Sequence, residues 1–223
     1  MIVDERIRTY LNSLDKGHTD LLEELEQEAV SGRVPVIRRE MQSFIKTLLA
    51  VKRPARVLEV GTAIGFSTLL ICEYGPADLQ MVTIEHDAGR AERARENFRR
   101  AGRSGQIRLL EGDAGILLPE LSGEFDLIFM DAAKGQYIHW LPDILRLLAP
   151  GGVLLSDNVL QEGDLIESRY LVERRNRTIY KRMREYLYTL THDPALSTSV
   201  LPLGDGAALT VKLTENTKRT LEQ

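Results

Sequence analysis

The chain has 223 residues, a formal net charge of −4 and 43% hydrophobic residues. This composition is ordinary for a globular protein with a packed core, and the overall charge excludes a general polyanion binder. No window approaches the roughly 18 consecutive apolar residues of a membrane span, and the charged N-terminus lacks the apolar run of a secretory signal. We therefore expect a cytoplasmic protein. Its single cysteine, Cys72, lies in the apolar run TLLIC and is expected to be a buried structural thiol.

The first third of the chain is predicted to be helical, because apolar residues recur there at helical spacing. The three predicted helices cover about residues 4–14, 19–30 and 38–51. Asp20 is expected to cap the second helix, with Glu23 three residues later as in a capping box. We expect residues 1–223 to form a single domain, in which a helical appendage (1–52) precedes the core (53–223).

From residue 54 onward, apolar strands alternate with segments of helical length. The predicted strands are RVLEV, QMVTIE, IRLLEG, FDLIFMD, VLLSD, STSVLPL and AALTVKL. Helices are expected at 66–74, in the Arg- and Glu-rich segment after QMVTIE, at about 140–148 and within a long stretch over about 161–191. The pattern predicts an α/β fold whose sheet is mostly parallel, and the turn GDG predicts a closing hairpin with one antiparallel strand.

Ligands of open α/β sheets bind beyond the carboxyl ends of the strands, so the residues at these ends are candidates for a binding site. The first strand passes through Glu59 into a turn in which Gly61 and Gly65 allow a ligand to approach the backbone closely. Ser67 begins the next helix and could hydrogen-bond a ligand. Ala63 stands where a dinucleotide fold prefers its middle glycine, which weakens a dehydrogenase interpretation. A turn of this kind can also be purely structural.

Acidic residues end the next two strands. Glu85 is placed to accept hydrogen bonds from ribose hydroxyls, and Asp113, followed by Ala114, is placed to bind an adenine amino group. An isolated acid at a strand end is usually a helix cap or a solvated loop residue. The glycine turn and these two acids follow three successive strands. No Lys-Ser/Thr pair follows the glycines, which excludes a phosphate-binding P-loop. Together these features predict a site for an adenosine cofactor without phosphates.

Three oxygen-bearing side chains end the fourth and fifth strands: Asp131, Asp157 and Asn158. Adjacent strands lie about 4.8 Å apart, so these side chains converge if the two strands are neighbours. Two carboxylates and one amide suit a hard cation such as Mg²⁺, although Asp157 and Asn158 could merely form a turn. Lys134 follows closely enough to act as a general base there. Tyr137 fits either the pocket lining or the core.

The motifs VLEVGTAIGFST, TIE, GDA, DAAKGQY and SDNVL, in this order and spacing, resemble the cation-dependent O-methyltransferases, which include catechol and caffeoyl-CoA methyltransferases. The resemblance covers about residue 34 to the C-terminus. It implies a Rossmann-like S-adenosylmethionine-dependent methyltransferase fold of seven strands, the seventh antiparallel, and a dimer. It also implies that Asp131, Asp157 and Asn158 hold the metal, and that Lys134 is the base. The resemblance places Glu85 and Asp113 at the cofactor, which Asp131 would also contact.

The segments VPVI, DAAKGQY, RRNR and PLGDGAAL are more similar to the bacterial tRNA 5-hydroxyuridine methyltransferases, which modify the wobble base. That similarity implies that Ile37 and Ser67 also contact the cofactor. It further implies that tRNA is the substrate. We then expect its phosphates to be contacted by a basic cluster, which consists of Arg174, Arg175 and Arg177. Any single arginine is more commonly part of a solvated face.

Three other interpretations stay open. The first is a methyltransferase for small catechols or phenols, which uses the same chemistry. The second is a nicotinamide-dependent oxidoreductase, which binding of NAD without binding of S-adenosylmethionine would favour. The third is a non-catalytic RNA-binding module, which leaves the set of two aspartates and an asparagine unexplained.

Overall fold

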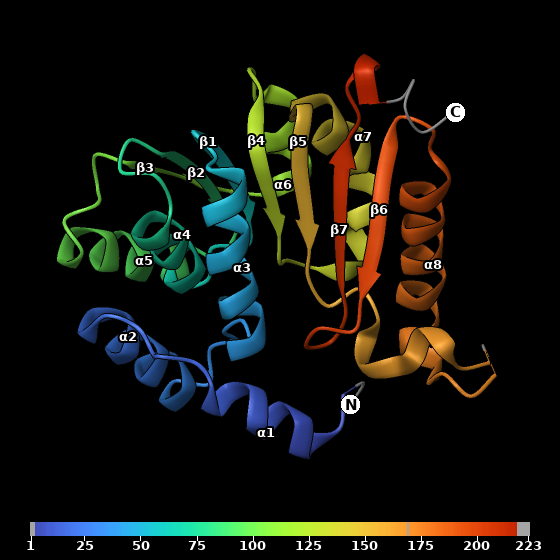
Figure 1. The fold of residues 1–223 in the computed structure, drawn as a ribbon, viewed down its shortest axis with the longest axis horizontal. Helices are drawn as coiled ribbons and strands as arrows, with labels where there is room; N and C mark the ends of the chain where they lie inside the picture. Colours follow the sequence, from blue (N-terminus) through green and yellow to red (C-terminus); the bar gives the residue numbers. More distant parts are fainter. Residues whose placement is uncertain (1–2, 169, 218–223) are drawn as a thin grey trace. The chain divides into compact units, whose positions relative to one another are not determined.

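The structure is a computed structural model that describes residues 3–168 and 170–217. Its seven strands form a mixed sheet in the order β3-β2-β1-β4-β5-β7-β6 (Figure 1). These strands are β1 (Arg56–Val60), β2 (Gln80–Glu85), β3 (Ile107–Glu111), β4 (Phe125–Met130), β5 (Leu148–Ser156), β6 (Leu196–Leu201) and β7 (Ala207–Lys212). Strand β7 runs antiparallel to both β5 and β6. The predicted α/β fold with a closing antiparallel hairpin is therefore confirmed.

Within the described part of the chain, helices precede the sheet and connect its strands, except between β6 and β7, which are joined by a turn. The α-helices are α1 (Glu5–Ser13), α2 (Asp20–Ser31), α3 (Arg39–Lys52), α4 (Phe66–Tyr74), α5 (Ala88–Arg100), α6 (Ala114–Glu120), α7 (Tyr137–Leu147) and α8 (Arg177–His192). Three short 3₁₀ helices are η1 (Lys134–Gln136), η2 (Gln161–Ile166) and η3 (Arg174–Asn176). None of the described helices combines the length and apolar character needed to cross a membrane.

The chain divides into two compact units, Val3–Leu117 and the part from Leu118 onward. The predicted division into an appendage and a core within one domain stays a prediction, and residues 1–2 and 218–223 of that prediction lie outside the described residues. The helices α1 to α3 belong to the same unit as β1, β2 and β3.

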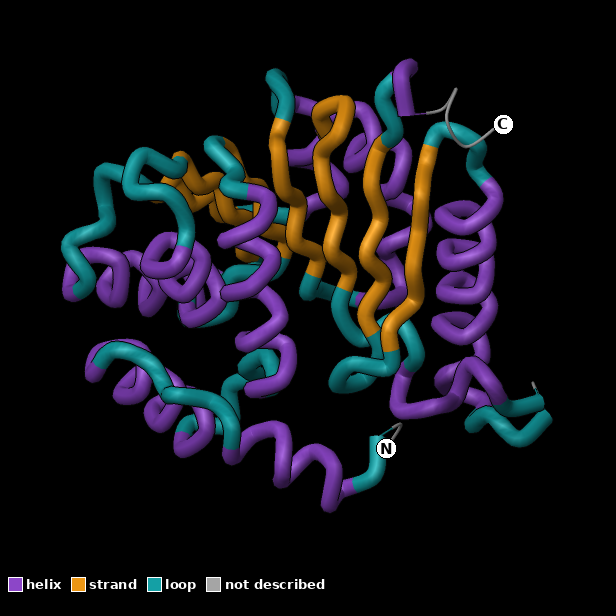
Figure 2. The backbone as a smooth tube through the Cα atoms, in the orientation of Figure 1, coloured by secondary structure: helices purple, strands orange, loops and turns teal. Residues whose placement is uncertain are grey.

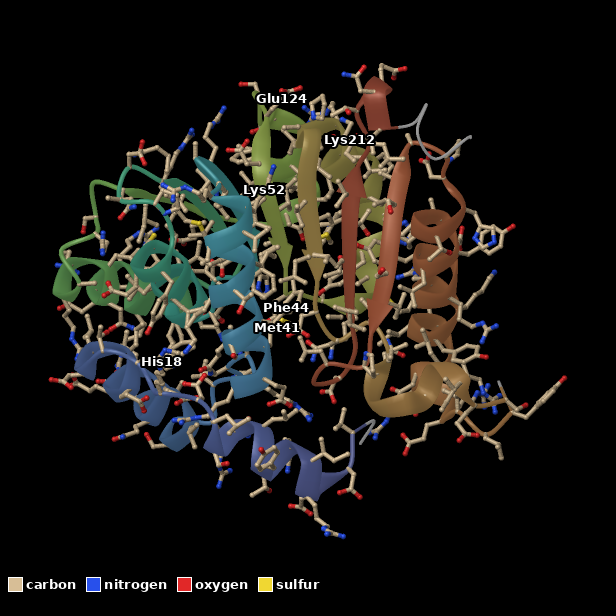
Figure 3. All side chains as sticks on the ribbon, viewed as in Figure 1. His18, Met41, Phe44, Lys52, Glu124 and Lys212 are labelled. Atoms are coloured by element: carbon tan, nitrogen blue, oxygen red, sulfur yellow. The ribbon has the colours of Figure 1, made fainter. Side chains whose placement is uncertain are left out.

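In the first unit, β1, β2 and β3 pair in parallel. The apolar side of α3 contributes Met41, Ile45 and Leu49 to the core, and Figure 3 labels Met41 on this helix. Cys72 is buried as predicted, and burial raises the pKa of its thiol to about 12. By contrast, α1 contains no buried residue.

The predicted cap of α2 is wrong. Asp20 is already the first residue of the helix, and Thr19 occupies the cap position without a side-chain capping bond. A carboxylate inside the helix lies one position too late to accept from the free backbone amides of the first turn. Glu23 instead accepts a hydrogen bond of 3.0 Å from the backbone nitrogen of His18, which is labelled in Figure 3.

In the second unit, β4, β5, β7 and β6 lie side by side (Figure 2). The strands β4 and β5 are parallel neighbours, as the predicted convergence of their ends requires. Lys212, on β7, donates hydrogen bonds of 2.8 Å to the carbonyl oxygens of Leu145 and Leu148. These bonds attach the hairpin to the end of α7.

The long stretch predicted as helical over about 161–191 is interrupted between η2 and α8. Side chains of α8 satisfy three carbonyl groups of this segment, which takes the place of helical hydrogen bonds at these groups. Arg177 donates to the carbonyl oxygens of Val172 at 3.1 Å and Tyr170 at 3.4 Å, and Tyr180 donates to that of Glu167 at 3.2 Å.

Candidate functional site

The glycine turn after β1 has the backbone geometry that its sequence predicts. Gly61 and Gly65 have φ angles of 105° and 87°, in the region that favours glycine. The nitrogen of Gly61 donates to the carbonyl oxygen of Ile84 at 3.0 Å. A Cβ atom on Gly65 would lie 2.5 Å from Cε1 of Phe98. The turn therefore packs too closely against α5 to accept a side chain at Gly65.

The carboxylate of Glu85 connects this turn to the end of β2. It accepts hydrogen bonds from the backbone nitrogens of Ala63 at 2.8 Å and Asp87 at 3.0 Å. Glu85 is buried, with 6% of its surface exposed. A carboxylate has about four acceptor positions, so two remain for ribose hydroxyls. The predicted role of Glu85 in ribose binding thus fits its surroundings and stays a prediction.

Glu59 and Ser67 bind each other in the interior beneath the turn. The Glu59 carboxylate accepts hydrogen bonds from Ser67 Oγ at 2.5 Å, from Thr83 Oγ1 at 2.6 Å and from Thr68 Oγ1. Glu59 is wholly buried and Ser67 is 8% exposed. In this arrangement both residues hold β1, β2 and α4 together below the glycine turn. Their predicted contact with a cofactor stays a prediction.

The remaining predicted cofactor residues of this unit lie in varied environments. Asp113 is exposed and caps α6, since its Oδ1 accepts from the nitrogen of Gly115 at 2.7 Å. Ala114 and Ile37 are both buried. The carbonyl oxygen of Ile37 accepts a hydrogen bond of 2.8 Å from the buried side chain of Gln42. This bond fixes the segment that leads into α3.

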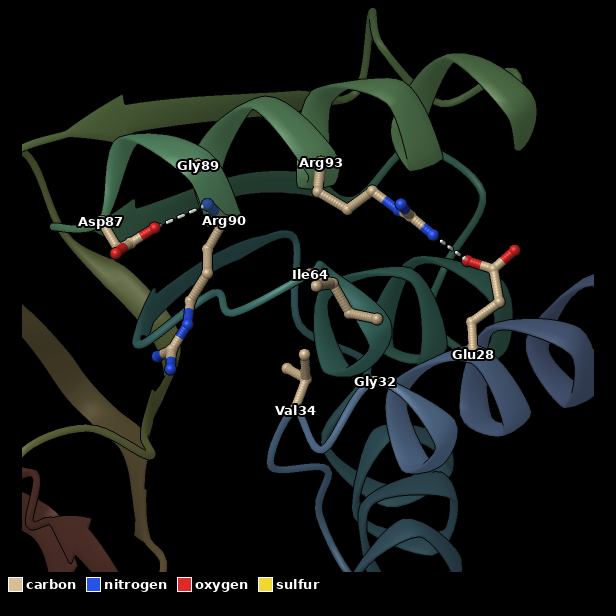
Figure 4. Close-up of a pocket in the computed structure, with 8 residues that line it drawn as sticks. All are labelled: Glu28, Gly32, Val34, Ile64, Asp87, Gly89, Arg90 and Arg93. Carbon is tan, nitrogen blue, oxygen red and sulfur yellow. Dashed lines mark hydrogen bonds and ion pairs between the residues drawn. The ribbon is translucent and has the colours of Figure 1, made fainter.

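A pocket of about 300 Å³ lies in the first unit (Figure 4). It is lined by Glu28, Gly32, Val34, Ile64, Asp87, Gly89, Arg90 and Arg93. Val34 and Ile64 provide apolar wall, and Arg93 closes one side through an ion pair with Glu28 at 2.7 Å. The pocket adjoins the glycine turn through Ile64, but none of the predicted cofactor residues lines it.

In the second unit, Asp131 and Asp157 follow two residues that are partners across parallel strands, Met130 on β4 and Ser156 on β5. The nitrogen of Asp157 donates to the carbonyl oxygen of Met130 at 2.9 Å, which holds the two strand ends together. Burial raises the pKa of Asp131 to about 6, and burial together with the charge of Asp131 raises the pKa of Asp157 to about 7. The ammonium group of Lys134 opposes both increases.

This donor set fits a divalent cation. The charge of Asp131 makes ionisation of the neighbouring Asp157 carboxyl more costly, and a cation between the two carboxylates would offset this cost. Oxygen donors are those that Mg²⁺ prefers. No group of three or more His, Cys, Asp or Glu residues that could hold a metal occurs in the described ranges. The predicted site is not such a group, because one of its three ligands is an asparagine. Its residues Asp131, Asp157 and Asn158 therefore stay candidate ligands.

Tyr137 is a structural support of these strand ends rather than a pocket residue. It is fully buried, and its hydroxyl donates to the carbonyl oxygen of Met130 at 3.0 Å. The same hydroxyl accepts from the nitrogen of Ala132 at 3.2 Å and lies 3.4 Å from the carbonyl oxygen of Asp157. Of the two environments that the sequence left open, the structure thus supports the core.

Asp205 was not singled out from the sequence, although it lies beside the candidate ligands. It is 8% exposed and comes from the turn between β6 and β7. Its Oδ2 lies 3.4 Å from Nδ2 of Asn158, and its charge contributes to the raised pKa of Asp157. The GDG turn was the only sequence signal that pointed to this position.

The predicted basic cluster lies on and just after η3. Arg174 and Arg175 are exposed, and Arg175 pairs with Glu173 at 2.6 Å. Arg177 is half-buried, and its guanidinium is bonded to two carbonyl groups of the preceding segment, those of Val172 and Tyr170. Two of the three arginines therefore present side chains to solvent, whereas the third has a structural role.

Known proteins resemble both the sequence and the fold. Over residues 12–213 the chain matches the model of a family described as O-methyltransferase. A catechol O-methyltransferase of Niastella koreensis is 34% identical over 128 residues, which cover 56% of this chain and 58% of that protein. The chain thus matches less than two thirds of this relative's length. A caffeoyl-CoA O-methyltransferase of Populus kitakamiensis is 28% identical over 96% of both chains.

Solved structures agree with this assignment. The SAH-bound structure of the methyltransferase PaMTH1 from Podospora anserina has a TM-score of 0.83 and is 28% identical, and the match covers 95% of each chain. The predicted methyltransferase fold is therefore confirmed. Because the family match extends over most of the sequence, this chain belongs to the O-methyltransferase family.

Proposed function

We propose that this chain transfers the methyl group of S-adenosylmethionine to a hydroxyl that lies beside a second oxygen, with the help of a divalent cation such as Mg²⁺. The observation that carries this proposal is the position of two aspartates, Asp131 and Asp157, directly after paired residues at the ends of the parallel neighbours β4 and β5. Membership of the O-methyltransferase family and the SAH bound to a relative of this fold support it.

Each group of residues has a distinct task in this proposal. Asp131, Asp157 and Asn158 would hold the cation, which when bound lowers the pKa of the substrate hydroxyl and stabilises its oxyanion. Lys134, in its neutral amine form, would accept the hydroxyl proton at Nζ. The glycine turn and Glu85 would bind the adenosine part of the cofactor and fix the orientation of its methyl group.

We further propose that the substrate is 5-hydroxyuridine at the wobble position of tRNA, which would become 5-methoxyuridine. A 5-hydroxyuracil ring carries its hydroxyl next to the O4 carbonyl, and this pair can chelate a cation as a catechol does. The exposed Arg174 and Arg175 support a polyanionic substrate. The alternative substrate class is small catechols or phenols, and the catechol O-methyltransferase among the relatives favours it.

A methyl-transfer assay tests both proposals. The substrates are tRNA that carries 5-hydroxyuridine, the same tRNA with unmodified uridine, and catechol, each with Mg²⁺ and with excess EDTA. Methylation of the 5-hydroxyuridine tRNA alone supports the tRNA proposal, and methylation of catechol alone supports the alternative. Full activity in EDTA contradicts cation dependence. Binding of NAD without binding of S-adenosylmethionine contradicts the methyltransferase itself.

We also propose that the chain forms a homodimer. Ile7 and Tyr10 on α1, and Leu14 directly after it, are more than half exposed, at 54%, 64% and 60%. An amphipathic helix that buries none of its apolar residues in its own unit is suited to packing against a second subunit. Sedimentation equilibrium of the wild type and of the Tyr10→Glu variant measures this. A monomeric wild type contradicts the proposal.

A further inference from the structure

The segment after β5 is held by the turn between β6 and β7. The nitrogens of Val159 and Leu160 donate to the carbonyl oxygens of Gly206 at 2.9 Å and Asp205 at 3.0 Å. The turn approaches so closely that a Cβ atom on Gly206 would lie 2.4 Å from Cγ of Leu160. The backbone on the C-terminal side of Asn158 is therefore fixed by this turn.

Asn158 itself has an unusual backbone conformation. Its φ angle is 58°, in the left-handed region that residues other than glycine seldom adopt. Its nitrogen donates to Oδ1 of Asp157 at 2.7 Å. Such a conformation persists where the surrounding contacts determine it, and it often marks a functional position. Here the backbone nitrogen of Asn158 is bonded to the carboxylate of Asp157, and its neutral side chain lies beside the carboxylate of Asp205.

The side chain of Asn158 has two chemically different ends. Only its carbonyl oxygen can bind a cation, because the amide nitrogen has no available lone pair. The nitrogen Nδ2 faces Oδ2 of Asp205 at 3.4 Å. If the amide were turned over, its oxygen would face the carboxylate oxygen, and two acceptors would repel each other. An acceptor at Asp205 therefore selects one of the two orientations.

We propose that Asp205 is a positioning residue, which binds the amide nitrogen of Asn158 and thereby keeps the amide oxygen available to the cation. This inference rests on the proposed cation site. It assigns to the hairpin turn a task that neither the sequence motifs nor the comparisons give it. Residues that orient a metal ligand typically change metal affinity by about 10- to 100-fold when they are removed.

The test measures the dissociation constant of Mn²⁺ by electron paramagnetic resonance on the full chain. We expect Asp205→Ala to weaken Mn²⁺ binding about 10-fold. Asp205→Asn should retain most of the affinity, because its amide oxygen can still accept from Asn158. A matched control is Asp193→Ala, since Asp193 caps another turn of the same unit by accepting from the nitrogen of Ala195 at 2.8 Å. The control should leave Mn²⁺ affinity unchanged.

A double-mutant cycle separates positioning from a direct effect of the Asp205 charge. If Asp205 acts through Asn158, Asp205→Ala should cause little further loss in the Asn158→Ala background. An equal loss in both backgrounds, or equal loss in Asp205→Asn and Asp205→Ala, overturns the inference while the cation site remains. A wild type that binds no Mn²⁺ overturns the proposed cation site and this inference with it. Urea unfolding of each variant confirms that the compared proteins are folded.

Discussion

At the scale of single residues, Asp157 is the most informative candidate ligand. We expect Asp157→Ala to abolish methyl transfer and to remove Mg²⁺ binding, because one of the two carboxylates of the proposed cation site is lost. S-adenosylmethionine binding should stay close to that of the wild type, since Glu85 and the glycine turn are unchanged. Calorimetric titration with cofactor and with cation measures the two effects separately. Equal loss of both affinities would mean that Asp157 supports the fold rather than the cation.

The raised pKa values of Asp131 and Asp157 predict an unusual pH dependence of stability. Both groups are more easily protonated in the folded chain, where their pKa values are about 6 and about 7, than at the usual value of 3.8. The folded state therefore binds more protons than the unfolded state between about pH 4 and pH 7. The contribution of these groups to the free energy of unfolding falls as the pH rises through this range.

A bound cation should reverse this loss, because it stabilises the charged carboxylates. We expect the increase in melting temperature on adding Mg²⁺ to be small at about pH 5 and to grow toward about pH 8. Thermal unfolding with Mg²⁺ and with EDTA measures this difference. Asp157→Asn is the matched control, since it keeps the shape of the side chain and removes the titrating group. An equal effect of Mg²⁺ at all pH values would show that the cation binds elsewhere.

At the scale of elements, the glycine turn gives a prediction with an internal control. Gly65→Ala places a methyl group in contact with Phe98 at a φ of 87°. The control is Gly102→Ala. Gly102 has a φ of 64°, and a Cβ atom there would meet no heavy atom within 4 Å. The control should cost about 1–2 kcal/mol from backbone strain alone. Gly65→Ala should cost about 1–3 kcal/mol more from overpacking, and only this variant should weaken S-adenosylmethionine binding. Urea unfolding and cofactor titration measure both effects, and equal costs would contradict the close packing.

The same elements show which parts of the site could be predicted from the sequence. Asp131 and Asp157 could be found because apolar strands run directly into them, and parallel neighbours end at the same edge. Asp205 could not, because it reaches Asn158 only through the antiparallel pairing of β7 with β5. Local propensity contains no information about such a long-range contact.

Other features were misjudged for local reasons. A sequence pattern locates the start of a helix only to within one or two residues. The cap of α2 was therefore predicted at Asp20, although Thr19 occupies that position. The helical pattern of the stretch 161–191 was overridden where Arg177 and Tyr180 supply hydrogen bonds to carbonyl groups. The environment of Tyr137 was left open rather than misjudged, because the sequence does not reveal the three polar partners that satisfy its buried hydroxyl.

At the scale of the whole molecule, the net charge of −4 means that any attraction to tRNA must come from a local cluster. Arg174→Ala with Arg175→Ala is the appropriate change, because both side chains are exposed. Arg177 is excluded, since its guanidinium holds the segment around Val172. If each of the two arginines neutralises one phosphate, the slope of log K against log salt should become less steep by about 0.7–0.9 per arginine.

A matched control removes the same charge from another surface. Arg95 and Arg99 on α5 are exposed at 40% and 60% of their side chains, and both pair with glutamates. Replacing these two with Ala changes the net charge equally, so a general electrostatic effect would weaken tRNA binding in both double variants. A specific contact predicts a loss, and a smaller salt slope, for the Arg174 and Arg175 variant alone. Filter binding of tRNA over a range of salt concentrations measures both quantities. If neither variant changes the slope, phosphate recognition by this cluster is wrong, and a small catechol or phenol becomes the better candidate substrate.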